Sequence, residues 1–423
     1  MRFSRQMITV EDALHRLLER LGKQGSEEVH IGEAYGRTLA CDMYATEDLP
    51  HFDRSPLDGF AVRAVDTVAA APDQPVRLKV VETIAAGDVP TVALTEGCAS
   101  RIMTGAMLPS GADAIIMFEQ TEQPAAFAAE VGIKRSLKPG ENVSRRGEEI
   151  RQGTIIAREG EIINAGTMAI LATFGYAHVP VVRKPRIGLL STGVELLDVD
   201  QPLIPGKIRN SNTLMLSALI AEAGGIPLLF PNMPDDLEVA KGTLTEHLKL
   251  VDVLVTSGGV SVGDYDVMAA LTDEPEAELL FNRIAMRPGS PTTSLMLQGK
   301  PIIALSGNPG ACFLGFELFV RPTILSLSGR QEVRMRTIQA KLAISYTKPC
   351  PYPRYLRGWL IEEEGVLYAQ PDFNEKAGNL GTLKNSECFI IIPAGGSGKQ
   401  AGELVEVLSH TMPSWKVREG KRL

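Results

Sequence analysis

The feature that most constrains this chain is a run of about 140 residues in which short apolar segments alternate with helical segments. The apolar segments are 187–190, 226–230, 251–256 and 302–305, and the helical segments are 213–223, 237–250 and 311–325. Strands that alternate with helices form βαβ crossovers around a parallel sheet. This run therefore predicts a doubly wound α/β domain.

The regions on either side of the run have different patterns. Residues 46–143 contain short apolar runs separated by turns, such as 76–84 and 114–118, which predict an inserted β-rich domain. Residues after 329 return to short strands, such as 389–392, and predict a small β-barrel or sandwich. Thr9 and Asp12 begin a helix, and 166–174 and 179–182 read as a helix and a strand. The chain is multidomain, because 423 residues exceed the ~150 that are typical of one domain.

Charge and cysteine content narrow the class of protein. The net charge of −8 argues against a nucleic-acid partner, which would need a basic stripe to neutralise phosphates. The five cysteines are far apart and odd in number, so they predict reduced thiols rather than a zinc site or a disulfide framework. We find neither a signal peptide nor an apolar run long enough to span a membrane, and we expect a cytoplasmic protein without a membrane partner.

Three loops in the α/β run share one character, because each follows a buried-type strand and combines glycine with hydroxyl side chains. Their candidate ligand-binding residues are Ser191, Thr192 and Gly193, then Ser257, Gly258, Gly259 and Ser261, and then Ser306, Gly307, Asn308 and Pro309. Open α/β sheets bind ligands at the carboxyl ends of their strands, where backbone N–H groups and hydroxyls can hold an anion. One such loop would be an ordinary turn, whereas three on one edge favour a phosphate-bearing ligand. No loop matches a Walker or Gly-x-Gly-x-x-Gly pattern, so ATP hydrolysis through a P-loop and NAD chemistry are disfavoured.

Charged residues near these loops complete the candidate site. Arg283 and Arg287 precede Pro288 and Gly289, and an arginine fork binds phosphate in a bidentate manner. Carboxylates follow the predicted strand ends as well, and beside a phosphate site they indicate a divalent cation such as Mg²⁺. These carboxylates are Glu195, Asp235, Asp264 and Asp266, and for Asp264 a turn-forming role is favoured.

Several long motifs together resemble the MoeA family, which is similar to the E domain of gephyrin and to the plant molybdenum-insertase domain. The motifs lie at 52–61, 101–106, 142–149, 191–196, 257–263 and 307–309, and the resemblance covers nearly the whole chain. The sequence departs from the common family pattern at Ser290, Gly310, Ala311 and Ala377. The first three remove one cation and one hydroxyl from the candidate anion site.

The resemblance implies an L-shaped homodimer whose subunit has four domains. These are a discontinuous N-terminal domain of residues 1–45 plus 144–181, an inserted β-rich domain of 46–143, a molybdopterin-binding α/β domain of 182–328, and a C-terminal β-barrel of 329–411. It also implies an enzyme of molybdenum cofactor biosynthesis, a transferase that inserts molybdate into the dithiolene of adenylyl-molybdopterin and releases AMP with the help of Mg²⁺. Other proteins of cofactor synthesis are candidate partners.

The resemblance also assigns roles to particular residues. Asp58, Thr104, Glu195, Asp235 and Asp266 carry over as catalytic positions, and the last three are the candidate metal ligands. Arg283, Arg287 and Arg357 carry over as cations that bind the substrate. Asp58 and Thr104 are expected to reach the α/β loops from the partner subunit. Two alternatives stay open at this point, namely an adenylyltransferase that makes the pterin nucleotide and a non-catalytic anchoring protein.

Overall fold

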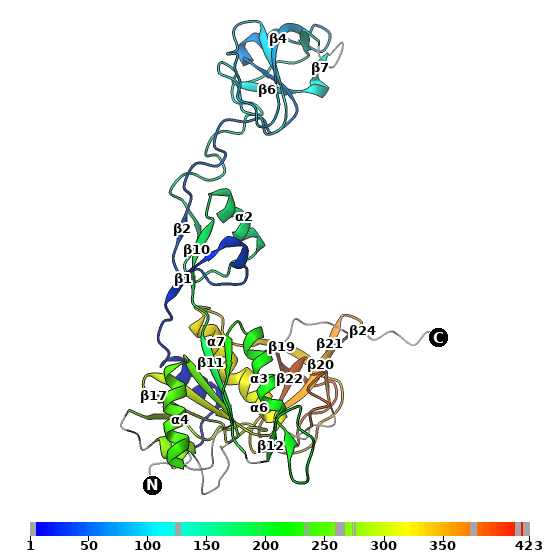
Figure 1. Cartoon of the computed structure of the whole chain (residues 1–423). Coiled ribbons are helices and arrows are strands. Elements are labelled where there is room, and N and C mark those ends of the chain that lie inside the picture. Colours follow the sequence, from blue (N-terminus) through cyan, green and yellow to red (C-terminus); the bar gives the residue numbers. More distant parts are fainter. Residues whose placement is uncertain are drawn as a thin grey trace. The chain divides into compact units, whose positions relative to one another are not determined.

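The computed structural model describes residues 6–122, 128–193, 195–232, 237–258, 267–272, 274, 276–372, 379–410 and 416–417. The chain forms two compact units (Figure 1). One unit comprises Met1–Glu28, Gly36–Ala40 and Pro180–Leu423, and the other comprises Val29–Tyr35 and Cys41–Val179. A two-stranded sheet joins β1 (Ser26–His30) to β10 (His178–Val182).

The larger unit contains the predicted α/β sheet, in the strand order β14-β11-β15-β18-β17-β16. Its first four strands are parallel, as the alternating pattern predicts. They are β11 (Arg186–Ser191), β14 (Ile226–Leu229), β15 (Val253–Ser257) and β18 (Lys300–Leu305). The helices of this unit are α1 (Val10–Leu18), α3 (Ser211–Glu222), α4 (Leu237–Lys249), α5 (Val267–Leu271), α6 (Pro309–Gly315) and α7 (Arg321–Leu327).

Both faces of the sheet are covered, so its strands are apolar at almost every position. Val253 and Val255 pack on one side with α1, α3 and α6, whereas Leu254 packs on the other side with α4 and α5. Side chains alternate between the two faces of a strand, and a continuous apolar run is therefore the sign of a sheet buried on both sides. The doubly wound arrangement is confirmed.

Two strands at one edge were missed by sequence reasoning. β16 (Glu278–Phe281) pairs antiparallel with β17 (Thr293–Leu297), and β17 pairs antiparallel with β18, so the sheet is mixed. β17 and β18 are joined by a tight turn in which Gln298 and Gly299 both have positive φ, at 52° and 71°. Such two-residue turns join antiparallel strands, and here the turn adds an antiparallel edge to the parallel sheet.

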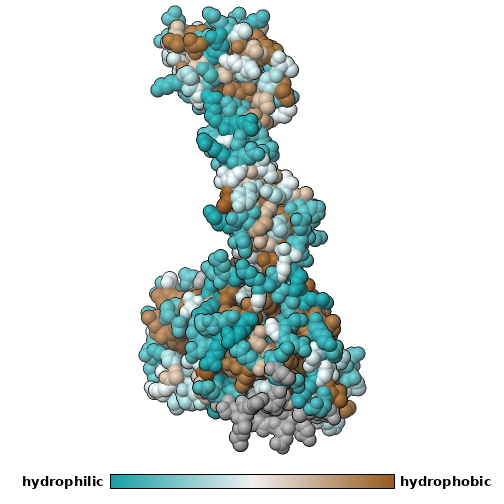
Figure 2. Space-filling view, turned by 90° about the vertical axis from the view of Figure 1, so that its left-hand side faces the viewer, coloured by the Kyte–Doolittle hydropathy of each residue, from teal (hydrophilic) through white to brown (hydrophobic). Residues whose placement is uncertain are grey.

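The helix that follows β18 is longer than predicted and contains an irregular turn. A π-helical turn, η4 (Phe316–Val320), lies between α6 and α7. The segment Pro309–Leu327 is long and apolar enough to cross a membrane by length and composition, but 83% of its apolar window is buried inside the fold. This segment is therefore a helix of the protein core. On the face of the molecule drawn in Figure 2, hydrophilic side chains surround scattered apolar ones.

The C-terminal strands of the larger unit close into a barrel, as expected. The order β21-β19-β23-β22-β20 is closed by a further pairing of β21 with β20, and β24 adds to β20. The strands are β19 (Arg336–Leu342), β20 (Arg354–Glu363), β21 (Val366–Pro371), β22 (Cys388–Ile392), β23 (Leu404–Ser409) and β24 (Lys416–Val417). Tyr355 and Phe389 of the barrel belong to the same apolar cluster as α1 and α6, so the barrel and the α/β sheet share a core.

The smaller unit contains the inserted β structure, with the strand order β6-β3-β5-β4-β8-β7. Its elements are β3 (Gly59–Val62), η2 (Ala64–Thr67), β4 (Val76–Ile84), β5 (Cys98–Ile102), β6 (Ala114–Met117), η3 (Phe118–Gln120), β7 (Thr121–Glu122) and β8 (Glu130–Ile133). The same unit holds η1 (Ile31–Glu33), β2 (Met43–Tyr44), β9 (Ile155–Ala157) and the predicted helix α2 (Ala165–Thr173).

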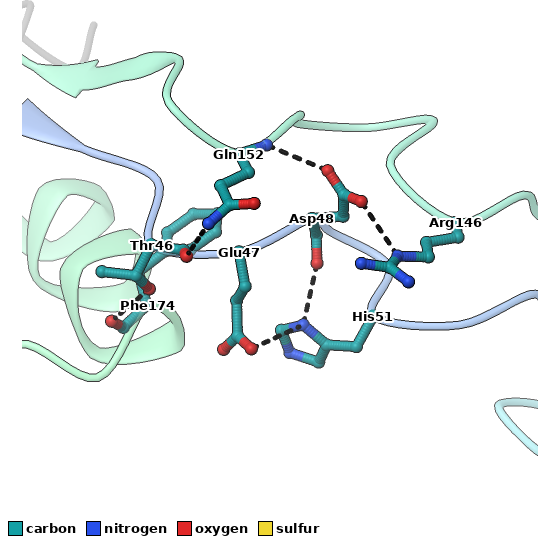
Figure 3. Close-up of polar contacts among 7 residues, drawn as sticks. All are labelled: Thr46, Glu47, Asp48, His51, Arg146, Gln152 and Phe174. Carbon is teal, nitrogen blue, oxygen red and sulfur yellow. Dashed lines mark hydrogen bonds and ion pairs between the residues drawn. The ribbon is translucent and has the colours of Figure 1, made fainter.

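Two segments of the smaller unit run antiparallel to each other and are joined at Asp48 (Figure 3). Backbone bridges pair Leu49 with Ile150 and Arg54 with Ser144. The Asp48 carboxylate accepts hydrogen bonds from the Gln152 backbone N–H at 3.0 Å and from Arg146 Nε at 2.9 Å. These contacts, the Gln152 N–H first, lower the pKa of Asp48, and they fix the two segments side by side.

The four-domain boundaries implied by the resemblance stay a prediction. The resemblance places the N-terminal helix with residues 144–181, yet Ala13, Leu14 and Leu17 of α1 pack in the apolar cluster of the α/β sheet. A packing face buried against distant strands is not visible in local sequence, which explains the difference.

Candidate functional site

The three predicted loops meet at the carboxyl ends of adjacent parallel strands. β11, β15 and β18 are neighbours in the sheet, with Ser191 beside Ser257 and Ser257 beside Leu305. A cavity of about 520 Å³ lies at this edge, and we call it the strand-end cavity. It is lined by Thr192, Gly193, Glu195, Leu196, Ile208, Arg209, Asn210, Ser211, Asn212, Ser257, Gly258, Pro291, Ser306, Gly307 and Asn308.

Backbone hydrogen bonds join the loops to one another. The Thr192 N–H donates to the Ser257 carbonyl at 3.1 Å, and the Gly258 N–H donates to the Leu305 carbonyl at 3.0 Å. These two N–H groups are therefore engaged within the protein, although the sequence pattern suggested them for an anion. An anion in the cavity would instead meet hydroxyl groups and the start of α3.

Two glycines are required by how closely the loops approach. Gly193 has a φ of +135°, and a Cβ added there would lie 2.4 Å from Glu195 Oε2. Gly258 has a φ of +93°, and its added Cβ would lie 2.6 Å from Thr192 Oγ1. Any larger residue would push the Glu195 carboxylate or the Thr192 hydroxyl from its place, so these glycines shape the cavity.

Sequence reasoning missed the residues that begin α3. Asn210 caps this helix, since its Oδ1 accepts from the Thr213 N–H at 3.2 Å. Asn210, Ser211 and Asn212 line the cavity, so the first turn of the helix and the positive end of its dipole lie at its wall. The run Asn-Ser-Asn-Thr before an apolar helix was the available signal, because asparagine is a preferred capping residue.

Charged groups in the wall come from the same region. Arg209 is an exposed cation, and its Nη2 and Nε donate to the Gln201 carbonyl at 3.1 and 3.3 Å. Glu195 is an exposed carboxylate. Beneath the wall, burial raises the pKa of the Cys312 thiol to about 12, so this thiol stays protonated and is not a nucleophile near neutral pH.

Sequence reasoning missed Arg209, and the three cations that it predicted do not belong to the lining of the strand-end cavity as the structure describes it. Arg283 and Arg287 have exposed side chains on the segment between β16 and β17. The backbone of Arg287 joins the barrel, donating to the Pro353 carbonyl at 3.0 Å and accepting from the Tyr355 N–H at 2.9 Å. Arg357 is 5% exposed in β20. Ser191, Pro288, Gly289 and Pro309 also lie outside the lining, although their neighbours Thr192, Pro291 and Asn308 belong to it.

Asp58 and Thr104 form a pair in the smaller unit. Asp58 Oδ1 accepts hydrogen bonds from the Thr104 N–H at 2.7 Å and from Thr104 Oγ1 at 2.8 Å. The Thr104 N–H is the main reason that the pKa of Asp58 is lowered, followed by the hydroxyl of the same residue. Both side chains are exposed, so the structure presents a fixed carboxylate to solvent.

Four of the predicted site residues lie outside the described residues, namely Asp235, Gly259, Ser261 and Asp266. Of the three candidate metal ligands, Glu195 alone is described. Within the described ranges no three His, Cys, Asp or Glu side chains form a group that could hold a metal ion. The donor set in the cavity is thus one carboxylate with hydroxyl and amide oxygens, which suits a cation that keeps waters and substrate oxygens, as Mg²⁺ does.

Comparisons with known proteins match most of the chain. Residues 8–175 match the MoeA N-terminal region (domains I and II), residues 188–326 match a probable molybdopterin-binding domain, and residues 339–409 match the MoeA C-terminal region (domain IV). The molybdopterin molybdenumtransferase of Bacillus subtilis is 42% identical over 96% of this chain and 94% of its own, and that of Staphylococcus aureus strain COL is 39% identical over 96% of both.

The solved structures agree with this match. A molybdopterin biosynthesis MoeA protein from Pyrococcus horikoshii superposes with a TM-score of 0.83 at 33% identity, covering 96% of this chain and 100% of the other. A second structure of a MoeA protein from Pyrococcus horikoshii OT3 gives a TM-score of 0.80 at 29% identity, with the same coverage.

Proposed function

This chain belongs to the MoeA family, and from that premise we propose that the strand-end cavity binds the phosphate-bearing part of a pterin nucleotide. The chain is a transferase of molybdenum cofactor biosynthesis, the activity for which its relatives are named. Its substrates are molybdopterin, in the adenylylated form that the resemblance implies, and molybdate. The proposal adds where these substrates bind and which residues contact them.

The observation that carries the proposal is the meeting of three strand ends and a helix start around one cavity. Ser257 and Ser306 contribute hydroxyls, and α3 contributes the positive end of its dipole. Arg209 adds a cation that pairs with phosphate oxygens through its planar fork. A phosphate has only acceptor oxygens, so the hydroxyl hydrogens, the cation and the helix start in this wall are complementary to it.

A magnesium ion fits the single described carboxylate of the cavity. We assign Glu195 to hold it, together with Asp235 and Asp266 as the resemblance implies. The ion, when bound, supplies positive charge that offsets the charge on the phosphoanhydride. Gly193 keeps the Glu195 carboxylate folded back over the loop, because no Cβ occupies that space.

The chain's own residues then position the nucleotide for cleavage of the anhydride. Hydroxyls and the α3 terminus hold the phosphates, and Arg209 stabilises the charge that grows on them as the P–O bond to AMP breaks. The oxygen that attacks phosphorus comes from water or molybdate, and molybdenum is taken up by the dithiolene sulfurs of the pterin. Protein thiols are not needed for this capture, and Cys312 stays neutral below the cavity.

A homodimer with shared sites completes the proposal. Asp58 and Thr104 belong to a different compact unit from the cavity, and the resemblance assigns them to the site of the partner subunit. Arg283, Arg287 and Arg357 would then serve parts of the substrate beyond the cavity wall. The five cysteines form no disulfide, which fits a cytoplasmic location.

The two alternatives are less well supported. A stand-alone adenylyltransferase would need only the α/β part, whereas the relatives match this chain over nearly its full length, including the N-terminal and barrel regions. An anchoring protein would not need the fixed carboxylate of Asp58 or the polar cavity that Glu195 lines.

The test is a reconstitution with purified components. The protein is mixed with adenylyl-molybdopterin, Mg²⁺ and molybdate, and AMP release and cofactor formation are followed together. We expect both to require molybdate and to fall by at least about tenfold in Arg209→Ala, since a charge-assisted contact contributes about 1.5–3 kcal/mol. Arg186→Ala, which removes an exposed cation at the opposite end of β11, is the matched control. Wild-type activity in Arg209→Ala would remove this cavity from the reaction.

A further inference from the structure

Two asparagines at the start of α3 each donate a hydrogen bond to a serine at a strand end. Asn210 Nδ2 donates to Ser191 Oγ at 2.9 Å, at the end of β11. Asn212 Nδ2 donates to Ser257 Oγ at 2.7 Å, at the end of β15, and to the Gly307 carbonyl at 2.8 Å, in the loop after β18. Asn212 thus ties the helix to two of the three loops that form the cavity.

The contacts of Asn212 fix the direction of the hydrogen bond to Ser257. The Gly307 carbonyl can only accept, so the amide NH₂ group must face it, and its second hydrogen points at Ser257 Oγ. The Cys312 thiol also points its weak donor at Ser257 Oγ, at 3.9 Å. The serine oxygen therefore accepts, and its own hydroxyl hydrogen remains for another acceptor in the cavity that Ser257 lines.

The amide oxygen of Asn212 indicates that this side chain is not placed here to stabilise the fold. Asn212 is 9% exposed, and its Oδ1 is buried with no hydrogen-bond partner among the residues that the structure describes. A buried acceptor without a partner destabilises the fold, and native proteins retain few of them. The two donated hydrogen bonds are the compensation, and they act on loops that line the cavity.

We propose that Asn212 is a positioning residue that holds the end of β15 and the loop after β18 together and turns the Ser257 hydroxyl hydrogen toward a phosphate oxygen of the bound ligand. The inference rests on the proposed function, because it assumes that the cavity holds the phosphates of adenylyl-molybdopterin. Asn212 lines the cavity, but its two amide hydrogens are used within the protein. Its effect on binding passes through Ser257, and this distinguishes it from a residue that merely stabilises the fold.

The experiment is a double-mutant cycle on the full chain. Affinity for adenylyl-molybdopterin, without molybdate, is measured by calorimetry for wild type, Asn212→Ala, Ser257→Ala and the double variant. We expect each single variant to bind about tenfold more weakly, the loss of one hydrogen bond. In the double variant we expect little further loss, because removing Asn212 cannot misdirect a hydroxyl that is already absent.

Asn210→Ala combined with Ser257→Ala is the matched control, since Asn210 donates to Ser191 instead. In this control, the losses of affinity caused by the two single substitutions should multiply in the double variant. If Asn212→Ala does not fold, Asn212→Asp replaces it in the same cycle, because aspartate keeps the shape and removes the donors, and its charge affects both backgrounds alike.

The possible results distinguish a failure of the positioning role from a failure of the proposed binding site. Losses that multiply to about a hundredfold in the Asn212 and Ser257 double variant overturn the positioning role and leave the proposed site intact. Wild-type protein that binds no adenylyl-molybdopterin overturns the proposed site, and the role of Asn212 with it.

Discussion

Gly193 determines where the Glu195 carboxylate can lie. An added methyl group would stand 2.4 and 2.7 Å from the two carboxylate oxygens, and the φ of +135° is strained for any residue but glycine. We therefore expect Gly193→Ala to move the carboxylate and to reduce AMP release by at least about tenfold, with a stability loss of about 1 kcal/mol from backbone strain. AMP release and the thermal midpoint are measured on the same preparation.

Gly206→Ala is the control for strain alone. Gly206 also has a positive φ, +80°, but an added Cβ there meets no atom within 4 Å. This variant should lose comparable stability and keep its activity. Equal activity losses in both variants would mean that strain, and not the position of Glu195, accounts for the effect.

The Asp58–Thr104 pair gives a prediction about pH. Hydrogen bonds from the Thr104 N–H and hydroxyl favour the charged carboxylate and lower the pKa of Asp58. Their stabilising effect is complete above the ordinary aspartate pKa of about 3.9, and it is lost as the pH falls through the lower folded-state value. In Thr104→Ala the backbone N–H remains, so the pKa of Asp58 should rise only part of the way, as a carboxyl-carbon NMR titration would detect.

Thr104→Ser keeps the hydroxyl and should leave the pKa of Asp58 where it is in wild type. An unchanged pKa in Thr104→Ala would show that the hydroxyl contributes nothing and that the backbone alone fixes the carboxylate.

At the residue scale, the sequence predicted the kinds of chemical group in the site better than it predicted which residues line the cavity. Thr192, Ser257 and Ser306 could be found because hydroxyls and glycines follow apolar strands, whereas Ser191 lies behind the cavity wall, hydrogen-bonded to Asn210 and Thr213. The roles of Asn210 and Asn212 depend on which loops the start of α3 contacts. These contacts are a property of the fold and not of the local sequence. Neither Arg283 nor Arg287 lies in the cavity wall, because the segment that carries them continues toward an antiparallel strand and the barrel.

At the scale of elements, His410 follows β23 and lies between α6 and β22. Its ring is 5.0 Å from that of Phe313 and 5.2 Å from that of Phe389. Burial, helped by the charge of Arg321, lowers the pKa of His410 from 6.5 to about 4. Between these values the unfolded chain binds a proton and the folded chain does not, so the free energy of unfolding rises with pH across this window. The full effect is roughly 3 kcal/mol, at 1.36 kcal/mol per pKa unit.

His410→Gln should flatten this pH dependence, since glutamine does not titrate. Urea unfolding of the two proteins at pH 4.5 and pH 7 is the measurement, and the difference between them cancels the carboxylates common to both. The exposed His15→Gln is the matched control and should behave as wild type. Parallel pH curves for wild type and His410→Gln would contradict a buried neutral imidazole.

Elements were predictable where an apolar run is bounded by turns or is buried on both faces. β4 begins and ends as expected, and the central strands β11, β15 and β18 are apolar because both faces of the sheet are covered. The π-helical turn η4 was not predictable, because its sequence is that of an ordinary apolar helix. Its Glu317 pairs with Arg321 four residues later, with Oε2 2.6 Å from Nε, and the complete burial of Glu317 depends on tertiary packing.

At the scale of the whole molecule, segments that are far apart in the sequence pack together. α1 packs with strands that begin about 170 residues later, and the smaller unit is formed by the chain between them. Local patterns predict each part, but they carry no information on which distant face a helix covers. This is why the domain boundaries remain a proposal while the α/β sheet and the barrel were recognised.

The last prediction concerns the proposed dimer. If Asp58 acts in the site of the partner subunit, then Asp58→Ala and Glu195→Gln damage different halves of each shared site. In a mixed dimer of the two variants, one site contains both defects and the other contains neither. After complete exchange about half of the dimers are mixed, so about a quarter of all sites are wild type. AMP release should therefore rise from the level of either variant toward about a quarter of wild type as the subunits exchange.

The exchange itself is verified separately, by following two affinity tags into one dimer. Two variants of the cavity, Glu195→Gln and Arg209→Ala, serve as the matched control. Both residues line the same cavity of one chain, so a mixed dimer of these variants has a defect in every site and should recover no activity. Verified exchange without recovery in the Asp58 and Glu195 mixture would mean that Asp58 acts within its own chain or not at all, and the proposal of a shared site would then be wrong.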